Sequence, residues 1–150
     1  MTDIVDRETR SRMMSGIRGK DTKPELVVRR FLHSQGFRFR LHRKDLPGRP
    51  DIVLPRYKVA IFVNGCFWHG HQDCNLFKLP SSNTSFWQDK ISKNRLRDRA
   101  KWDELQQIGW SVVVVWECAV AKKHRLSPDA LTSVLVGAIR NPAPLTHIRS

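Results

Sequence analysis

The sequence predicts one α/β domain in which a mixed β-sheet lies between helices. Its length of 150 residues fits a single domain, and a hydrophobic content of 40% is sufficient for a sizeable core. The periodicity of the apolar residues gives the order helix, three strands, helix, strand, helix. Helices that are interleaved with strands in this way pack on both faces of one sheet.

A helix is the first clearly predicted element. Thr22 can serve as its N-cap, Pro24 occupies its first turn and Glu25 completes a capping box. Gly36 lies where the helix ends. Residues 1–20, which precede it, predict only a weak helix rich in arginine.

Three strands and a long helix follow. FRFRL (37–41) alternates apolar and polar residues as a half-buried strand does, whereas DIVL (51–54) and VAIFV (59–63) predict more buried strands. A long basic helix is predicted over residues 85–108, and Gly109 ends it.

The last predicted elements are a central strand, WSVVVVW (110–116), and a helix over 127–140 that a Ser-Pro pair begins. Residues 141–150 contain two prolines and predict a loose tail.

The composition is strongly basic, with a formal net charge of +13 and a pI near 10.5. This charge predicts a polyanionic partner, chiefly nucleic acid, and the alternative is a basic surface that serves only solubility. No helix has the apolar and Lys-rich faces that an acidic membrane surface requires. The N-terminus lacks a secretory signal and no apolar run reaches the ~18 residues of a membrane span, so we expect a cytoplasmic protein without membrane contact.

The stretch CFWHGHQDC, residues 66–74, suggests a metal site. Cys66, His71 and Cys74 have the spacing C-x4-H-x2-C, and Cys118 ends a strand predicted to lie beside the one that leads into Cys66. Three cysteines are an odd number, which argues against a disulfide framework. A closed set of thiolates and one imidazole is typical of structural zinc. The alternative is a buried Cys118 with free thiols in the loop.

His69 remains after this assignment. In an extended segment its side chain would point away from that of His71. A histidine that is fixed beside a metal site can act as a general base near pH 7. The alternatives are a second candidate zinc ligand and an ordinary surface histidine.

Three carboxylates are candidates for the chemistry. Asp51 could hold Mg²⁺, which activates water at phosphate, although an Asp after a turn is more often a turn residue. Glu25 could assist, but the capping box already explains it. Asp98 could orient a histidine, or pair with Arg95 or Lys101 on its own basic helix. The basic residues of that helix predict contacts with phosphate.

The aromatic residues Phe67, Trp68 and Trp87 occur in polar surroundings. On a rigid loop such side chains can wedge between base pairs. The alternative, which is favoured for Trp87, is packing onto the core. Met14 and Ile17 could insert likewise, although they also fit an ordinary amphipathic helix.

Several stretches together resemble the very short patch repair (Vsr) endonuclease family. They are MTDIVDRETRSRMMSGIRGKDTKPE, LPGRPDIVLPRYKVAIFVNGCFWHGHQDC, FW…KI.KN…RD and GW.VVVVWEC. The match runs from about residue 6 to residue 120, and GCFWH with WEC is highly specific. The family has a restriction-endonuclease-like fold. It nicks DNA 5′ to the thymine of T·G mismatches that arise when 5-methylcytosine deaminates.

The resemblance implies a role for each catalytic candidate. Asp51 would be the central Mg²⁺ ligand, assisted by the backbone carbonyl of Val63. His69 would be the general base and Asp98 would orient it. Glu25 matches an acidic position near the active site.

The resemblance also implies the other sites. The structural Zn²⁺ would be held by Cys66, His71, Cys74 and Cys118. The DNA-binding residues would be Phe67, Trp68 and Trp87 as a wedge that opens the duplex, Met14 and Ile17 inserted from the other groove, and Asn94.

Two features depart from the family. Val63 stands where the family often has Thr, which matters only if a hydroxyl and not the carbonyl binds metal. The loop has one more residue between His71 and Cys74 than some relatives have, which leaves the histidine ligand open.

We therefore expect a Mg²⁺-dependent DNA mismatch endonuclease that initiates very short patch repair. It would act as a monomer on double-stranded DNA with a T·G mismatch, and downstream repair proteins would follow. Residues 1–20 would contact DNA, 21–140 would form the endonuclease domain and 141–150 the tail. The alternatives are a non-catalytic, zinc-stabilised DNA-binding module and an endonuclease of the same fold that cuts a matched sequence.

Overall fold

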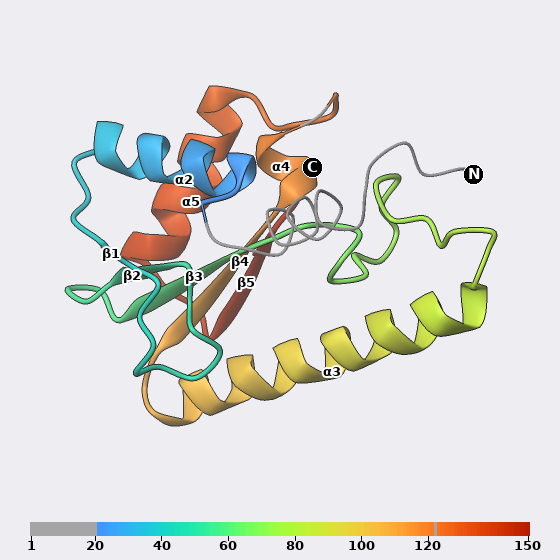
Figure 1. Cartoon of the computed structure of the whole chain (residues 1–150). Coiled ribbons are helices and arrows are strands. Elements are labelled where there is room, and N and C mark those ends of the chain that lie inside the picture. Colours follow the sequence, from blue (N-terminus) through green and yellow to red (C-terminus); the bar gives the residue numbers. More distant parts are fainter. Residues whose placement is uncertain (1–20, 122) are drawn as a thin grey trace.

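The computed structural model describes residues 21–121 and 123–150, which form the five-stranded sheet of Figure 1. The strands, in their order across the sheet, are β1 (Arg40–Leu41), β2 (Ile52–Leu54), β3 (Val59–Asn64), β4 (Ser111–Trp116) and β5 (Leu145–Ile148). β1, β2 and β3 pair antiparallel, whereas β3, β4 and β5 pair parallel. The prediction of a mixed sheet is confirmed.

Helices cover both faces of this sheet, as the sequence predicted. α2 (Lys23–Ser34) and α5 (Pro128–Arg140) lie on one face, and the 24-residue α3 (Thr84–Gln107) lies on the other (Figure 1). The first half of α3 extends beyond the edge of the sheet (Figure 1). It is therefore available to support a loop there.

Two separate cores result, because successive side chains of a strand point to opposite faces of the sheet. Ile61 of β3 belongs to the core beneath α2 and α5, together with Leu32 and Leu135. Phe62, the next residue, belongs to the core against α3, where its ring meets Trp102 edge-on with a centroid separation of 6.5 Å.

Local sequence signals explain where α2 and α5 begin. The hydroxyl of Thr22 accepts a hydrogen bond from the N–H of Glu25 at 3.4 Å, and that of Ser127 accepts one from Ala130 at 3.1 Å. A proline in the first turn of each helix favours the same start. α3 begins after Asn83, which has a left-handed φ of 54° and no side-chain cap.

Two parts of the fold before the tail differ from the prediction. Within 37–41 only Arg40 and Leu41 pair with β2, because Phe37 turns into the core and packs against Tyr57. A short helix, α4 (Glu117–Val120), follows β4 directly and was not predicted.

The expected loose tail, residues 141–150, instead contains β5. This strand pairs with β4 from Val112 opposite Leu145 to Val115 opposite Ile148, and Ile148 is buried. The two prolines precede the strand, where a missing N–H removes no ladder hydrogen bond, and Pro144 accepts one from Val112 N–H at 3.0 Å.

No helix in the described ranges has the length and apolar character that crossing a bilayer requires. The interpretations of residues 1–20, and with them those of Met14 and Ile17, lie outside the described residues.

Candidate active site and metal centre

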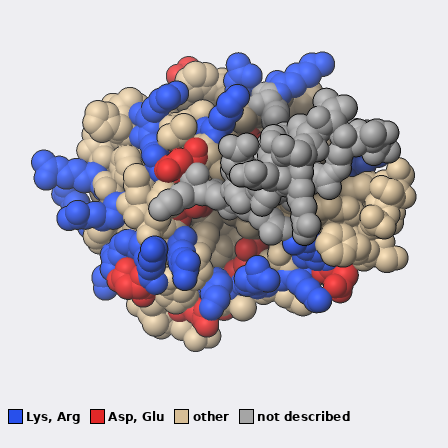
Figure 2. Space-filling view, in the orientation of Figure 1, with Lys and Arg blue, Asp and Glu red and all other residues tan. Residues whose placement is uncertain are grey.

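A cavity of about 1190 Å³ lies between the beginning of α2, the end of β3 and the side of α3. Its lining is rich in basic side chains, and Lys and Arg are also spread around the face shown in Figure 2. The basic residues of the lining are Lys23, Lys44, Arg49, Lys90, Lys93, Arg97 and Lys101. A concave surface of this size and charge suits a polyanion such as DNA.

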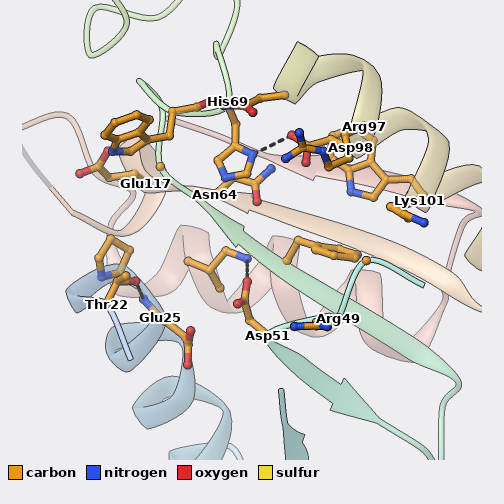
Figure 3. Close-up of a pocket in the computed structure, with 18 of the residues that line it drawn as sticks. Thr22, Glu25, Arg49, Asp51, Asn64, His69, Arg97, Asp98, Lys101 and Glu117 are labelled. Carbon is orange, nitrogen blue, oxygen red and sulfur yellow. Dashed lines mark hydrogen bonds and ion pairs between the residues drawn. The ribbon is translucent and has the colours of Figure 1, made fainter. Parts of the chain in front are cut away.

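Acidic groups and a histidine lie within this basic cavity. Asp51 and Glu25 approach it from one side, and His69 with Asp98 approaches from the other (Figure 3). Carboxylates amid basic residues make this cavity a candidate active site, because carboxylate oxygens can hold a divalent cation beside a bound phosphate.

Asp51 immediately precedes β2, and the end of β3 fixes its carboxylate. Its Oδ2 accepts a hydrogen bond from the N–H of Val63 at 2.8 Å. Burial raises the pKa of Asp51 to about 6; the Val63 N–H opposes this and the charge of Glu25 adds to it. The protein alone therefore compensates the negative charge of Asp51 poorly.

Glu25 is almost fully buried in the first turn of α2. One carboxylate oxygen accepts the N–H of Asp21 at 3.4 Å, so the side chain caps Asp21 and not Thr22 as a regular capping box would. The other oxygen contacts His42 Nε2 at 2.9 Å and also pairs with Arg29. Capping is therefore only one of its contacts.

His69 and Asp98 form a hydrogen-bonded pair across the cavity from Asp51. Asp98 Oδ2 lies 2.6 Å from His69 Nδ1 (Figure 3). Neither same-helix alternative for Asp98 is found, because Lys101 pairs with Glu104 and Arg95 donates to Gly70. An imidazole held through Nδ1 keeps Nε2 for an exchangeable proton.

α3 holds the loop on both sides of His69. Asn94 Nδ2 donates to the carbonyl of Trp68 at 2.8 Å, and Arg95 Nε donates to the carbonyl of Gly70 at 2.7 Å. Gly70 has a φ of +59°, and a Cβ there would overlap Arg95 and Ile91. The helix and the glycine together fix the position of the His69 backbone.

The candidate metal centre follows from the register of β3 and β4. Asn64 lies opposite Trp116 in this parallel pair, so Cys66 and Cys118, each two residues further on, come together. The ligand atoms of Cys66, His71, Cys74 and Cys118 all lie within 4.8 Å of one another. His71, and not His69, is the histidine among the thiols, and one ion could be held there.

His71 is positioned for such an ion. Its Nδ1 lies 3.5 Å from the sulfur of Cys66 and 3.6 Å from that of Cys118, and its ring stacks on Trp116 with centroids 4.0 Å apart. Burial, with the neighbouring thiols, raises the pKa of the Cys66 thiol. A bound dication would reverse that effect by stabilising the thiolate.

The aromatic candidates form one cluster. Phe67 meets Trp68 at 5.4 Å and Trp87 at 5.5 Å, and Trp68 meets Trp87 at 5.7 Å between ring centroids. All three are partly exposed. The structure thus brings together the loop and the start of α3, as the expected grouping of these three residues requires.

Three residues near the site were not identified from the sequence. Asn64 lines the cavity and is 3% exposed, and its side-chain Nδ2 lacks a hydrogen-bond partner among the described residues. Glu117 accepts the N–H of Cys66 at 3.2 Å. His42 links Glu25 to the main chain of Asp51, because its own N–H donates to the Asp51 carbonyl at 3.0 Å. No local spacing signals these long-range contacts.

A family model described as DNA mismatch endonuclease Vsr matches residues 2–76. The chain is 51% identical to the type II nicking enzyme V.XorIIP of Xanthomonas oryzae pv. oryzae, over 81% of this chain and 88% of that protein. It is 46% identical to the DNA mismatch endonuclease Vsr of Escherichia coli (strain K12), over 90% of this chain and 86% of that protein.

Proposed function

The chain belongs to the Vsr family of DNA mismatch endonucleases, and from this premise we propose that it nicks DNA 5′ to the thymine of T·G mismatches. Such mismatches arise when 5-methylcytosine deaminates, and the nick would begin very short patch repair. The observation that carries the proposal is the placement of the His69–Asp98 pair across a basic cavity from Asp51.

His69 is the proposed general base. Its Nδ1 is engaged by Asp98 at 2.6 Å, so Nε2 can take a proton from the attacking water at the scissile phosphate. Asp98 keeps the ring in this orientation and stabilises the imidazolium that results. The basic residues of the cavity hold the DNA backbone on either side.

Asp51, with the backbone carbonyl of Val63, is the proposed Mg²⁺ site. Oxygen ligands suit this ion, and the raised pKa of Asp51 identifies a carboxylate whose charge a dication would compensate. These oxygens would hold Mg²⁺, which would act there as a Lewis acid at the phosphate. Val63 needs no side-chain hydroxyl for this role, because its backbone carbonyl oxygen is the proposed ligand.

Zn²⁺ is the proposed ion of the Cys66, His71, Cys74 and Cys118 cluster. Three thiols and one imidazole that converge, with all but Cys74 buried, match the ligand set of closed, structural zinc sites. Since His69 lies between two of these ligands in the sequence, the ion would fix the loop that carries the base.

The aromatic cluster is the proposed mismatch probe. Phe67, Trp68 and Trp87 are partly exposed and support one another. Inserting such a wedge costs a few kcal/mol for each unstacked step, and a mismatched pair costs less to open. Asn94 would act on DNA indirectly, because its amide holds Trp68.

The remaining proposals concern the whole molecule. We assign the core to the restriction-endonuclease-like class, which the mixed sheet and the acidic residue before β2 support. We also propose a monomer that hands the nicked DNA to repair proteins, and DNA contacts from residues 1–20.

The test is nicking of an end-labelled duplex that contains one T·G mismatch, in several flanking contexts, with Mg²⁺ present or chelated. Asp51→Asn should abolish cleavage and retain binding, whereas Asp89→Asn, a carboxylate of the same cavity that pairs with Lys93, should change little. Cleavage by Asp51→Asn, or cleavage unaffected by chelation, would reject the proposed mechanism.

Cutting of a matched sequence is the second candidate, because several relatives are named type II nicking enzymes. A matched duplex of the same sequence distinguishes the two candidates. A DNA-binding module without catalysis would bind both duplexes and cut neither.

A further inference from the structure

A second cavity, of about 230 Å³, lies behind the His69–Asp98 pair. Both residues line it as well as the large cavity, so the pair forms a wall between the two spaces. The other sides are the loop at Gly70–Gln72, the face of α3 and the end of β5. None of the roles assigned above uses this space.

The floor of the second cavity is aromatic, and it presents a hydrogen-bond donor. Trp116 Nε1 donates to His147 Nδ1 at 3.0 Å, and Trp102 meets the His147 ring edge-on at 5.4 Å. An indole N–H can only donate, so His147 Nδ1 must accept. Burial, with the charges of Arg149 and Arg99, lowers the pKa of His147. A ring whose Nδ1 accepts this hydrogen bond carries its hydrogen on Nε2.

Arginines surround this floor, and carbonyl groups hold two of them in place. Arg149 donates to the carbonyls of Gln72 at 2.9 Å and Asp73 at 2.7 Å, and Arg95 donates to that of Gly70 at 2.7 Å. A carbonyl orients a guanidinium without neutralising its charge. The third arginine of the lining, Arg99, is exposed.

Negative charge is scarce in the same lining. Among the described residues that form it, Asp98 is the one carboxylate, and it is already engaged by His69. The cavity thus combines guanidinium groups with a neutral imidazole N–H. Several donors and an excess of positive charge in one concave surface suit a tetrahedral oxyanion.

We propose that this second cavity is a phosphate-binding site. It would be filled by a phosphate of the nicked DNA strand that is not the scissile phosphate. The DNA source of the phosphate rests on the proposed function, whereas inorganic phosphate would use the same donors. Occupancy would place a dianion or diester beside the back of the His69–Asp98 pair, so that one strand is held on both sides of the base.

Titration with inorganic phosphate tests the donors directly, without any DNA cleavage. The reporter is the indole N–H resonance of Trp116 in the zinc-loaded full chain, assigned with Trp116→Phe. We expect a saturable shift, and Arg99→Gln should weaken binding about five- to tenfold, as loss of one charge-assisted contact does.

His147→Asn gives a sharper variant, because an amide oxygen can still accept from Trp116 while the Nε2–H is lost. Phosphate binding should weaken while the fold persists. Arg56→Gln removes the same charge from the β2–β3 turn, where Arg56 lies over the ring of Tyr57, and should leave binding unchanged. An unsaturable shift, or equal effects of Arg56→Gln and Arg99→Gln, would overturn the proposal.

DNA duplexes with a single neutral methylphosphonate at successive positions identify the source. If a phosphate of the strand fills the cavity, a methylphosphonate at one position will weaken DNA binding by the unaltered protein. The same substitution will not weaken DNA binding by Arg99→Gln. A phosphate shift without such a position assigns the cavity to free phosphate. Absence of both the shift and the sensitive position rejects the site. Failure of T·G nicking alone would leave the phosphate titration intact and would count against the proposed function only.

Discussion

The cysteine cluster and the carboxylate cluster lie at the same end of β3, but they are built in opposite ways. Cys66 and Cys118 come from adjacent parallel strands in register, and the remaining ligands lie on one short loop. The carboxylates instead come from α2, the residue before β2 and α3. Three of the four residues of the cysteine cluster are buried, while the carboxylate cluster opens into a large cavity.

This difference suggests that the cysteine cluster serves stability, whereas the nearby carboxylate cluster serves reactivity. The four metal-ligand groups converge on one point, so one ion can satisfy them together. The acidic groups are satisfied separately, Asp51 by Val63, Glu25 by Arg29 and His42, and Asp98 by His69. No single partner is shared by all three carboxylates.

Removal of a metal ligand should have the largest effect. Cys118→Ser breaks the closed set, so we expect loss of bound zinc and a fall in the free energy of unfolding on the order of 5 kcal/mol. Metal analysis with chemical denaturation measures both. Ser133→Ala, on the exposed side of α5, is the control. Full stability of Cys118→Ser without metal would contradict the division between the two clusters.

Loss of the Asp98 carboxylate should act on activity and leave the fold intact. Asp98→Asn removes the charge that orients and stabilises the ring of His69, which should lower the nicking rate about a hundredfold or more while zinc content stays unchanged. Single-turnover nicking is the measurement. A parallel loss of zinc would show that the two clusters are not independent.

Stability in the absence of metal should depend on pH through Asp51. Because the pKa is raised to about 6 from an unfolded value near 3.8, the folded state binds more protons between these values. The contribution of Asp51 to the free energy of unfolding is then most favourable at the acidic end of this window and falls as the pH rises toward 6, by about 3 kcal/mol.

Denaturation of metal-free protein across this window measures the effect. Asp51→Asn should remove the slope that Asp51 contributes, and added Mg²⁺ should reverse it in the unaltered protein. A slope that is unchanged in Asp51→Asn would assign the pH dependence to other groups.

The smallest expected effect is that of His42, which connects two acidic residues without facing the cavity. His42→Ala leaves one oxygen of Glu25 with Arg29 alone, so the free energy of unfolding should fall by about 1 kcal/mol. His42→Gln, which retains a donor, should recover part of it. Thermal unfolding gives the comparison, and equal stability of both variants would remove His42 from this cluster.

The sequence predicted what depends on local spacing. The ligands Cys66, His71 and Cys74 lie within one loop, and the buried strands and helix caps follow from short patterns. The contact of His69 with Asp98 was expected from family resemblance, and the distance of 2.6 Å agrees with it. Their catalytic roles remain predictions.

What the sequence missed depends on distant partners. β5 is short and follows two prolines, and only its pairing with β4 makes it a strand. The link from Glu25 to His42 spans two elements and is set by tertiary packing. The second cavity likewise needs β5 in place, because His147 belongs to that strand. Because residues 141–150 were predicted to be a loose tail, the sequence could not predict that His147 lines a cavity.

The parallel register of β3 and β4 also has a consequence for folding. The two strands are joined through α3, so their pairing is a long-range event in folding. A shift of one residue in the register of this pair would misalign the side chains of β4 relative to those of β3. Such a slip would displace Cys118 by about 3.3 Å relative to Cys66 and turn its side chain to the opposite face. The four ligands can therefore bind one ion only in a chain whose β3 and β4 are paired in the correct register. The amount of bound metal then reports the fraction of molecules in which the sheet has assembled correctly.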